Sequence, residues 1–181
     1  MKRKDIFIFE IISTIFIIFL GFILHFLYEW TNNNIIVASF SAINESTWEH
    51  LKLLFFPMLI TIIIGTFIFR NSNYLCVKTK GLLLGLSFIL IFFYTYTGIL
   101  GYNIPILDIG SFIISVLISE YYSYKKFKYE NCNKTLFWII LFVLCFSFVI
   151  FTYKTPKIGI FKDPVDGSFG IKEKERKFLS N

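Results

Sequence analysis

Both histidines of the chain lie in segments that also contain carboxylates, a combination of residue types that can bind a divalent metal. Two imidazoles and one carboxylate would leave a fourth zinc position for water, which the metal could activate for hydrolysis. His25 and Glu29 are four residues apart, so a helix would place them on one face, where they could equally bond to each other or to lipid headgroups. The candidate ligand-binding or metal-binding residues are His25, Glu29, Asn44, Glu45, Glu49, His50 and Asp108.

The segment before His50 also has a purely structural interpretation. Ser46-Thr47-Trp48-Glu49 matches a capping box, in which Ser46 caps a helix and Glu49 reaches back to the backbone N–H of Ser46. Glu49 lies three residues before Lys52, a spacing that permits an ion pair. Because Glu49 and His50 would point about 100° apart on a helix, a metal would need ligands from different helices. The sequence leaves both interpretations open.

Five apolar segments are long enough to position these residues on membrane-spanning helices. The chain has 181 residues, of which 56% are hydrophobic and 20% aromatic, a composition typical of membrane proteins. About 20 mostly apolar residues cross a bilayer core, and lipid requires helices or closed barrels. The predicted fold is therefore an all-α polytopic transmembrane helix bundle. Its domain of residues 1–153 has spans at about 6–28, 51–69, 82–100, 104–122 and 136–153, and an extracytoplasmic tail follows at 154–181.

Basic residues near the span ends predict the orientation of the bundle. With the N-terminus in the cytoplasm, the outer connections between spans contain only Lys52, as the positive-inside rule favours. The candidate site then lies on the outer face. The C-terminus also lies outside, although the lysines of the tail favour the opposite side. The basic residues assigned to the inside are Lys2, Arg3, Lys4, Arg70, Lys78, Lys80, Lys125, Lys126, Lys128 and Lys134.

Small residues predict where the helices approach closely. Ser111, Ser115 and Ser119 repeat every four residues along the fourth span, and Gly81 and Gly85 have the same spacing at the start of the third. In lipid, such small residues let helix backbones pack against each other. We expect both sets to be packing surfaces rather than ligand grooves.

The remaining features exclude other classes of site. Cys76 and Cys132 fall in predicted cytoplasmic loops and Cys145 in the fifth span, so we expect neither a disulfide nor a cysteine metal motif. The net charge of +6 fits anionic lipid headgroups, and no nucleic-acid-binding pattern is present. Glu10 and Glu120 fall at span ends and no internal repeat is visible, which disfavours a transporter.

Several segments carry a resemblance to a known family. They are Leu24-His25-Phe26-Leu27-Tyr28-Glu29-Trp30, Asn44-Glu45-Ser46-Thr47-Trp48-Glu49-His50-Leu51-Lys52, Phe93-Tyr94-Thr95-Tyr96-Thr97-Gly98 and Phe161-Lys162-Asp163-Pro164. Together they resemble a family of small bacterial multi-pass membrane proteins that is known only as a domain of unknown function. The resemblance implies a multi-pass protein of the bacterial plasma membrane, and it implies no activity, cofactor or catalytic residue.

Three functional interpretations follow. The leading one is a membrane protein whose outer face bears a polar, carboxylate-rich and histidine-containing pocket for an unknown ligand, without an assigned enzymatic activity. The second is a metal-dependent membrane hydrolase acting on lipid or headgroup substrates, in which His25 and His50 bind a divalent metal such as zinc, and Glu45 or Glu49 is the general base. The third is a small transporter or a subunit of a membrane complex. The expected partner is the lipid bilayer, with a protein partner or a homo-oligomer left open.

Overall fold

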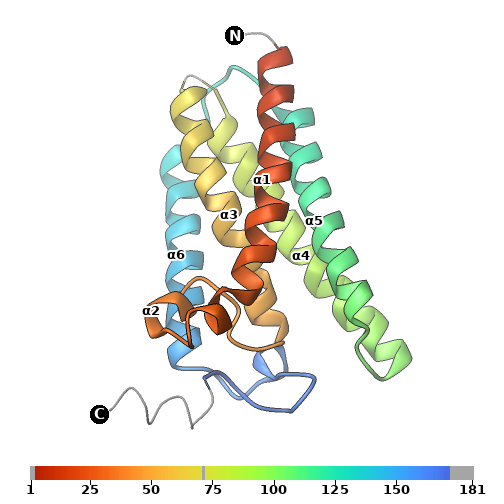
Figure 1. Ribbon diagram of the computed structural model, residues 1–181. Coiled ribbons are helices and arrows are strands. Elements are labelled where there is room, and N and C mark those ends of the chain that lie inside the picture. The colour runs from red at the N-terminus through yellow and green to blue at the C-terminus, as the bar shows by residue number, and fades with distance from the viewer. Residues whose placement is uncertain (1–2, 71, 172–181) are drawn as a thin grey trace.

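The computed structural model describes residues 3–70 and 72–171, and they form a bundle of long helices (Figure 1). Five of the helices are long and apolar enough to cross a membrane, which confirms the predicted all-α bundle. The elements in chain order are α1 (Arg3–Trp30), α2 (Ile35–Ala38), α3 (Thr47–Ile68), α4 (Tyr74–Leu100), α5 (Pro105–Lys126), α6 (Lys134–Tyr153) and the 3₁₀ helix η1 (Gly159–Phe161).

Local sequence signals determine several helix ends. Ser46 caps α3, because its hydroxyl accepts a hydrogen bond from the backbone N–H of Glu49 at 3.4 Å, as predicted. Asn34 caps the short α2 in the same way. Gly101 ends α4 with a φ of +81°, a left-handed conformation that glycine adopts without strain. Pro105 then occupies the first turn of α5, where its missing N–H costs no hydrogen bond.

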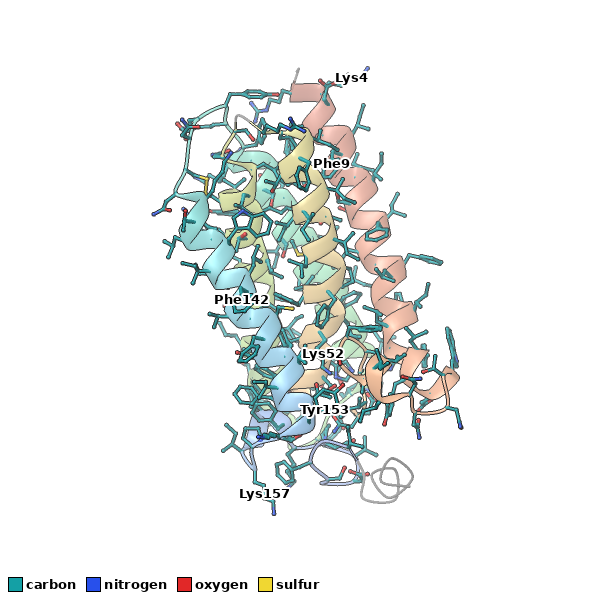
Figure 2. All side chains as sticks on the ribbon, turned by 90° about the vertical axis from the view of Figure 1, so that its left-hand side faces the viewer. Lys4, Phe9, Lys52, Phe142, Tyr153 and Lys157 are labelled. Carbon is teal, nitrogen blue, oxygen red and sulfur yellow. A yellow bond between two sulfur atoms is a disulfide. The ribbon has the colours of Figure 1, made fainter. Side chains whose placement is uncertain are left out.

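Successive long helices run in opposite directions, so the connections gather at two ends of the bundle (Figure 1). We call the end where α1 begins the N-terminal end, and the end where α1 finishes and α3 begins the site end. Figure 2 shows Lys4 and Phe9 toward the first, and Lys52, Tyr153 and Lys157 toward the second. The short α2 and the segment after α6 both lie at the site end.

Small residues hold α4 and α5 together, as the sequence predicted. Ser115 and Ser119 are fully buried on α5. A Cβ atom on Gly81 would lie 2.6 Å from the backbone oxygen of Ser119, and one on Gly85 would lie 2.3 Å from the Ser119 hydroxyl. Only glycine permits this approach, so these residues form a packing surface.

The structure corrects the prediction for the cysteines. A disulfide joins Cys76 to Cys132, with a Cα–Cα distance of 6.4 Å. Cys76 lies in the first turn of α4 rather than in a loop, and Cys132 lies in the connection before α6. Cysteine spacing could not reveal the pair, because a separation of 56 residues becomes a contact only when α4 and α5 fold back on each other.

Lys78 also lies elsewhere than predicted. It was assigned to a cytoplasmic loop, but α4 begins at Tyr74, so Lys78 points into the bundle and is fully buried. Its ammonium group donates to Glu10 of α1 and, at 2.5 Å, to Glu120 of α5. The cluster joins three helices at the N-terminal end, because buried charges need partners within the protein.

The segment from Lys154 to Ile171 packs against the site end of the bundle. Phe161 and Ile171 are buried, and Asp163 accepts a hydrogen bond from the backbone N–H of Gly167 across a tight turn. Asp-Pro at 163–164 and Asp-Gly at 166–167 are dipeptides typical of such turns. The charged end at 172–181, which belongs to the predicted tail, lies outside the described residues.

Candidate functional site

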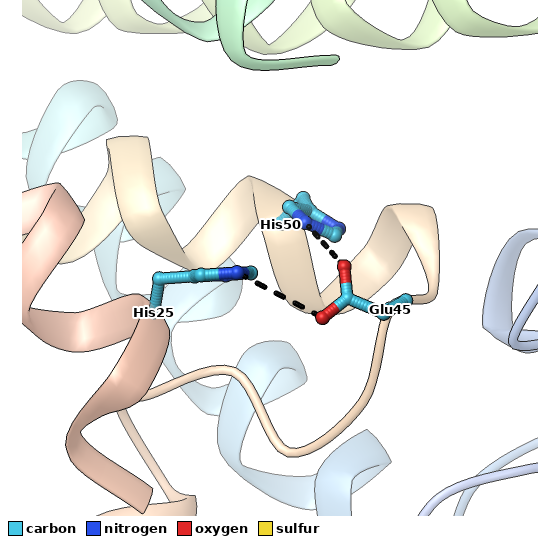
Figure 3. A group of neighbouring side chains, drawn as sticks. All are labelled: His25, Glu45 and His50. Carbon is cyan, nitrogen blue, oxygen red and sulfur yellow. Dashed lines mark ion pairs between the residues drawn. The ribbon is translucent and has the colours of Figure 1, made fainter. Parts of the chain in front are cut away.

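His25, Glu45 and His50 converge at the site end of the bundle (Figure 3). His25 comes from the last turns of α1, His50 from the first turn of α3, and Glu45 from the connection between them. The Nε2 atom of His50 lies 3.3 Å from Glu45 Oε2, and the Nε2 atom of His25 lies 3.8 Å from Glu45 Oε1. One ligand atom from each residue falls within 4.8 Å of the other two. Three separate segments thus bring two imidazoles to one carboxylate.

The backbone of α3 orients the His50 ring. Its Nδ1 atom lies 3.0 Å from the carbonyl oxygen of Ser46. Because a carbonyl oxygen can only accept, Nδ1 carries the hydrogen and Nε2 faces Glu45. This arrangement, in which one ring nitrogen bonds a backbone carbonyl and the other is directed at the site, is typical of metal-binding histidines.

The His25 ring is held mainly by packing. It contacts the Phe26 ring edge-on at a centroid distance of 4.6 Å and lies 5.4 Å from the His50 ring. Its Nδ1 atom is buried and has no hydrogen-bond partner among the described residues. Burying a ring nitrogen without a hydrogen-bond partner is costly, so the Nδ1 atom of His25 favours contact with a ligand or a water molecule.

Glu45 is positioned from the far end of the chain. Its backbone N–H donates to Asp163 Oδ2 at 3.2 Å, and the neighbouring Asn44 side chain donates to the backbone oxygen of Gly170 at 3.3 Å. Asp163 Oδ1 in turn accepts from the backbone N–H of Val165 at 2.8 Å. The segment after α6 therefore fixes the loop that carries Glu45.

The histidines also control the charge of Glu45. When the His50 ring carries protons on both nitrogens, its Nε2–H donates to Glu45 and holds the pKa of the Glu45 carboxyl below its usual value. The charge of the protonated imidazoles adds to this effect, and together they outweigh the effect of burial. Glu45 is therefore an anionic acceptor at neutral pH.

A cavity of about 250 Å³ opens beside the three side chains. Its lining is mainly apolar and comes from α1, α3, α5 and the connections around them. Asp108, in the first turn of α5, lines this cavity together with Glu45 and His50. The Tyr96 hydroxyl donates to Asp108 Oδ1 at 2.5 Å, which orients the carboxylate.

The other predicted candidates do not join this cluster. The Glu49 carboxylate lies 2.5 Å from Lys52 and accepts the backbone N–H of Ile43 at 3.2 Å, rather than that of Ser46 as the capping box predicts. The Asn44 side-chain amide donates to the backbone oxygen of Gly170, and its Oδ1 atom accepts the backbone N–H of Ser46 at 3.0 Å. Glu29 is exposed and is not one of the converging ligands.

Lys52 has a structural role beneath the site. It is fully buried at the site end (Figure 2), and its ammonium group is surrounded by acceptors. Besides pairing with Glu49, it donates to the backbone oxygens of Ala38 and Ser41 at 2.9 and 3.0 Å, and to the Thr152 hydroxyl at 2.7 Å. The pair thereby ties α3 to α6 and to the loop after α2, and leaves no donor for a ligand.

Comparison with known proteins gives a family. The model of a family of unknown function, DUF6512, matches residues 1–171. The chain belongs to the DUF6512 family. No curated protein and no solved structure matches it. The family match fits the resemblance seen in the sequence, and with the five apolar helices it fits a multi-pass membrane protein.

Some residues of the site in this DUF6512 chain were not among the sequence candidates. Tyr96 and Asp163 act by orienting Asp108 and Glu45, and the apolar lining of the cavity comes from α1 and α5. The Asp-Pro dipeptide at 163–164 is typical of a turn, but nothing in the sequence indicates that Asp163 contacts Glu45. The apolar residues that line the cavity belong to segments as apolar as the rest of the spanning helices, so the sequence does not distinguish them from other lipid-facing or core residues.

Proposed function

We propose that this protein is a metal-dependent hydrolase of the membrane, in which His25, His50 and Glu45 hold one divalent transition metal such as zinc. The observation that carries the proposal is the convergence of the three ligand groups within 4.8 Å, from two helices and a loop. Two imidazoles and one carboxylate are the ligand set of a well-known class of catalytic zinc sites, which keep one position open for water.

The geometry fits such an ion after small side-chain movements. Ligand atoms at roughly 2.0–2.2 Å from zinc lie about 3–4 Å from one another. The ligand atoms of His25, Glu45 and His50 lie within 4.8 Å of one another, so they need to move slightly closer. The Nδ1–H of His50 already bonds to the Ser46 carbonyl, which leaves Nε2 for the metal. Glu45 is held ionised by its neighbours, as a ligand must be.

The residues around the open position support hydrolysis. A zinc ion would lower the pKa of its bound water to about 7 and polarise a substrate carbonyl. Glu49 forms an ion pair with Lys52, and Glu45 would bind the metal. Asp108, which lines the cavity, is therefore the carboxylate that we assign as general base. The hydroxyl of Tyr96 keeps the Asp108 carboxylate oriented while it accepts a proton.

We further propose that the site faces the outside of a bacterial plasma membrane, with the N-terminus in the cytoplasm. The basic residues support this orientation, because Arg70, Lys80 and the group from Lys125 to Lys134 gather at the N-terminal end. The Cys76–Cys132 disulfide lies at the same end and favours the opposite side, since cytosolic thiols are kept reduced. In the proposed orientation, we expect this pair to be two neighbouring thiols in the cell.

A hydrolysis assay tests the proposed activity. Protein in vesicles, loaded with zinc, should hydrolyse p-nitrophenyl decanoate, and a chelator should abolish the reaction. Asp108→Asn should bind zinc normally but lower kcat by about 10²–10⁴-fold, the usual contribution of a general base. Glu45→Gln should lose zinc, whereas the exposed Glu29→Gln is the matched control and should behave as wild type. Equal rates for zinc-loaded wild type and Asp108→Asn would contradict the proposal.

A further inference from the structure

The cavity beside the candidate site is lined in part by exposed apolar side chains of α1 and α5. Three of the side chains that line it are also partly exposed on the outer surface: Phe22 (39%) and Phe26 (42%) of α1, and Ile109 (45%) of α5. Val165, from the segment after α6, also lines the cavity and is 72% exposed, so the cavity also has exposed lining at the site end. An apolar flank of a membrane-spanning bundle faces lipid, so Phe22, Phe26 and Ile109 provide an apolar border between the cavity and the bilayer.

The cavity is lined from both α1 and α5 and has a closed end. In Figure 1, the ribbons of α1 and α5 diverge from the N-terminal end toward the site end. The cavity is closed where Gly21 meets Phe112, because a Cβ atom on Gly21 would lie 2.5 Å from the Phe112 ring and 2.9 Å from the backbone oxygen of Leu53. A chain that enters between the helices would reach this contact and stop there.

The volume of the cavity limits what it can hold. At about 250 Å³, it is smaller than the roughly 300–1,000 Å³ of sites for drug-sized ligands. We expect a space of this volume to take one slender apolar chain rather than two side by side. The lining is correspondingly apolar, apart from the polar groups at the site end.

The charged residues that line the cavity determine which charge the headgroup of a ligand can carry. Within residues 3–70 and 72–171, the ionisable side chains that line it are His25, Glu45, His50 and Asp108, with no lysine or arginine among them. Lys52, the nearest buried cation in α3, is surrounded by Glu49, Thr152 and backbone oxygens. With a divalent metal bound, the two carboxylates would balance its charge, and an additional anionic headgroup would find no cation among the described residues that line the cavity.

We propose that the substrate is an uncharged, single-chain acyl ester that enters sideways from the bilayer between α1 and α5. Its acyl chain would lie along Phe22, Ile109 and Phe112, with the ester carbonyl at the metal and Asp108 alongside. This inference rests on the proposed hydrolase function. In the reaction, the oxygen of water bonds to the acyl carbon and the bond from that carbon to the alkoxy oxygen breaks. One proton passes through Asp108 to the alcohol, and a fatty acid is released.

Photocrosslinking in vesicles tests this inference. The probe is a monoacylglycerol with a diazirine in its chain, and a lysophosphatidate with the same chain is the anionic comparison. The monoacylglycerol should label peptides of α1 and α5 that contain Phe22 and Phe112, several-fold more strongly than the lysophosphatidate does. Ile109→Trp should reduce the labelling about tenfold, a loss of roughly 1.4 kcal/mol, by filling the cavity. Ile106→Trp is the matched control, because Ile106 is 75% exposed on α5 and does not line the cavity.

The zinc content of the same samples separates the two proposals. Zinc binding without labelling of the cavity, or equal labelling by both probes, would overturn the substrate inference while leaving the metal site intact. Labelling that Ile109→Trp abolishes, in protein that binds no zinc, would support a lipid pocket and overturn the hydrolase. Ile109→Trp should retain zinc, which shows that the variant is folded at the site.

Discussion

The His50 side chain connects the local structure of α3 to the chemistry of the site. Its Nδ1 atom is 3.0 Å from the Ser46 carbonyl and its Nε2 atom is 3.3 Å from Glu45. Ser46 also caps the helix, so the residue that starts α3 sets the direction of the imidazole as well. A change in the cap therefore alters both the helix end and the candidate ligand.

Metal binding should depend on pH through the histidines. Imidazole binds a metal only when neutral, and its ordinary pKa is about 6.5. Glu45 behaves differently: its pKa is lowered in the folded protein, so its stabilising contribution is present above the unfolded value and is lost only as the pH falls through the lower folded value. We therefore expect affinity to fall with pH over the range in which the imidazoles become protonated, by up to about tenfold per pH unit for each imidazole that takes up a proton.

Zinc titrations of purified protein at several pH values measure this dependence. A loss of affinity confined to the range near pH ~4, where a carboxylate titrates, would contradict the role of the two imidazoles.

Lys52→Met should destabilise the protein strongly without removing a site ligand. The change leaves the Glu49 carboxylate buried without its ammonium partner, which costs about 3–5 kcal/mol for pairs of this kind. Thermal unfolding in detergent measures the loss. The double variant Lys52→Met, Glu49→Gln should recover part of the stability, and a single variant as stable as wild type would show that the pair is not structural.

At the scale of elements, the sequence predicts what local patterns determine. The five helices follow from the length of the apolar segments, and the start of α3 follows from Ser46. The contact between Glu45 and Asp163 joins residues 118 positions apart, and nothing in either segment indicates the other. Likewise, the convergence of His25 with His50 depends on how α1 and α3 pack, so the candidate residues could be named while their grouping could not.

The packing of α4 on α5 provides a matched pair of glycine variants. Gly81→Ala should destabilise the protein by about 1–3 kcal/mol, because its Cβ would lie 2.6 Å from the rigid backbone oxygen of Ser119. Gly98→Ala in the same helix meets no atom within 4 Å and should be neutral or stabilising by up to about 1 kcal/mol. Unfolding curves of the two variants compare them directly, and equal stabilities would argue against close packing at Gly81.

At the scale of the whole molecule, two clusters of ionisable groups lie at opposite ends of the bundle. Glu10, Lys78 and Glu120 join three helices at the N-terminal end, whereas His25, Glu45 and His50 lie at the site end. The first cluster is closed within the protein, because all three residues are buried. The second borders a cavity, which is why we assign the ligand to it.

The orientation in the membrane can be measured with single cysteines. In a chain whose three native cysteines are replaced by alanine, Lys157→Cys should react with a membrane-impermeant maleimide in intact cells. Lys128→Cys, at the N-terminal end, should react only after permeabilisation if that end lies inside, as we propose from the basic residues. The reverse pattern would place the Cys76–Cys132 disulfide outside and turn the candidate site toward the cytoplasm.

The metal content of the detergent-purified protein tests the account most directly. Wild type should contain close to one zinc or similar transition-metal ion per chain. The double variant His25→Ala, His50→Ala should lose the metal, and Glu29→Gln, which changes a nearby exposed carboxylate, should keep it. A folded wild-type sample without bound metal after zinc loading, or a double variant that retains it, would contradict the metal site and the hydrolase built on it.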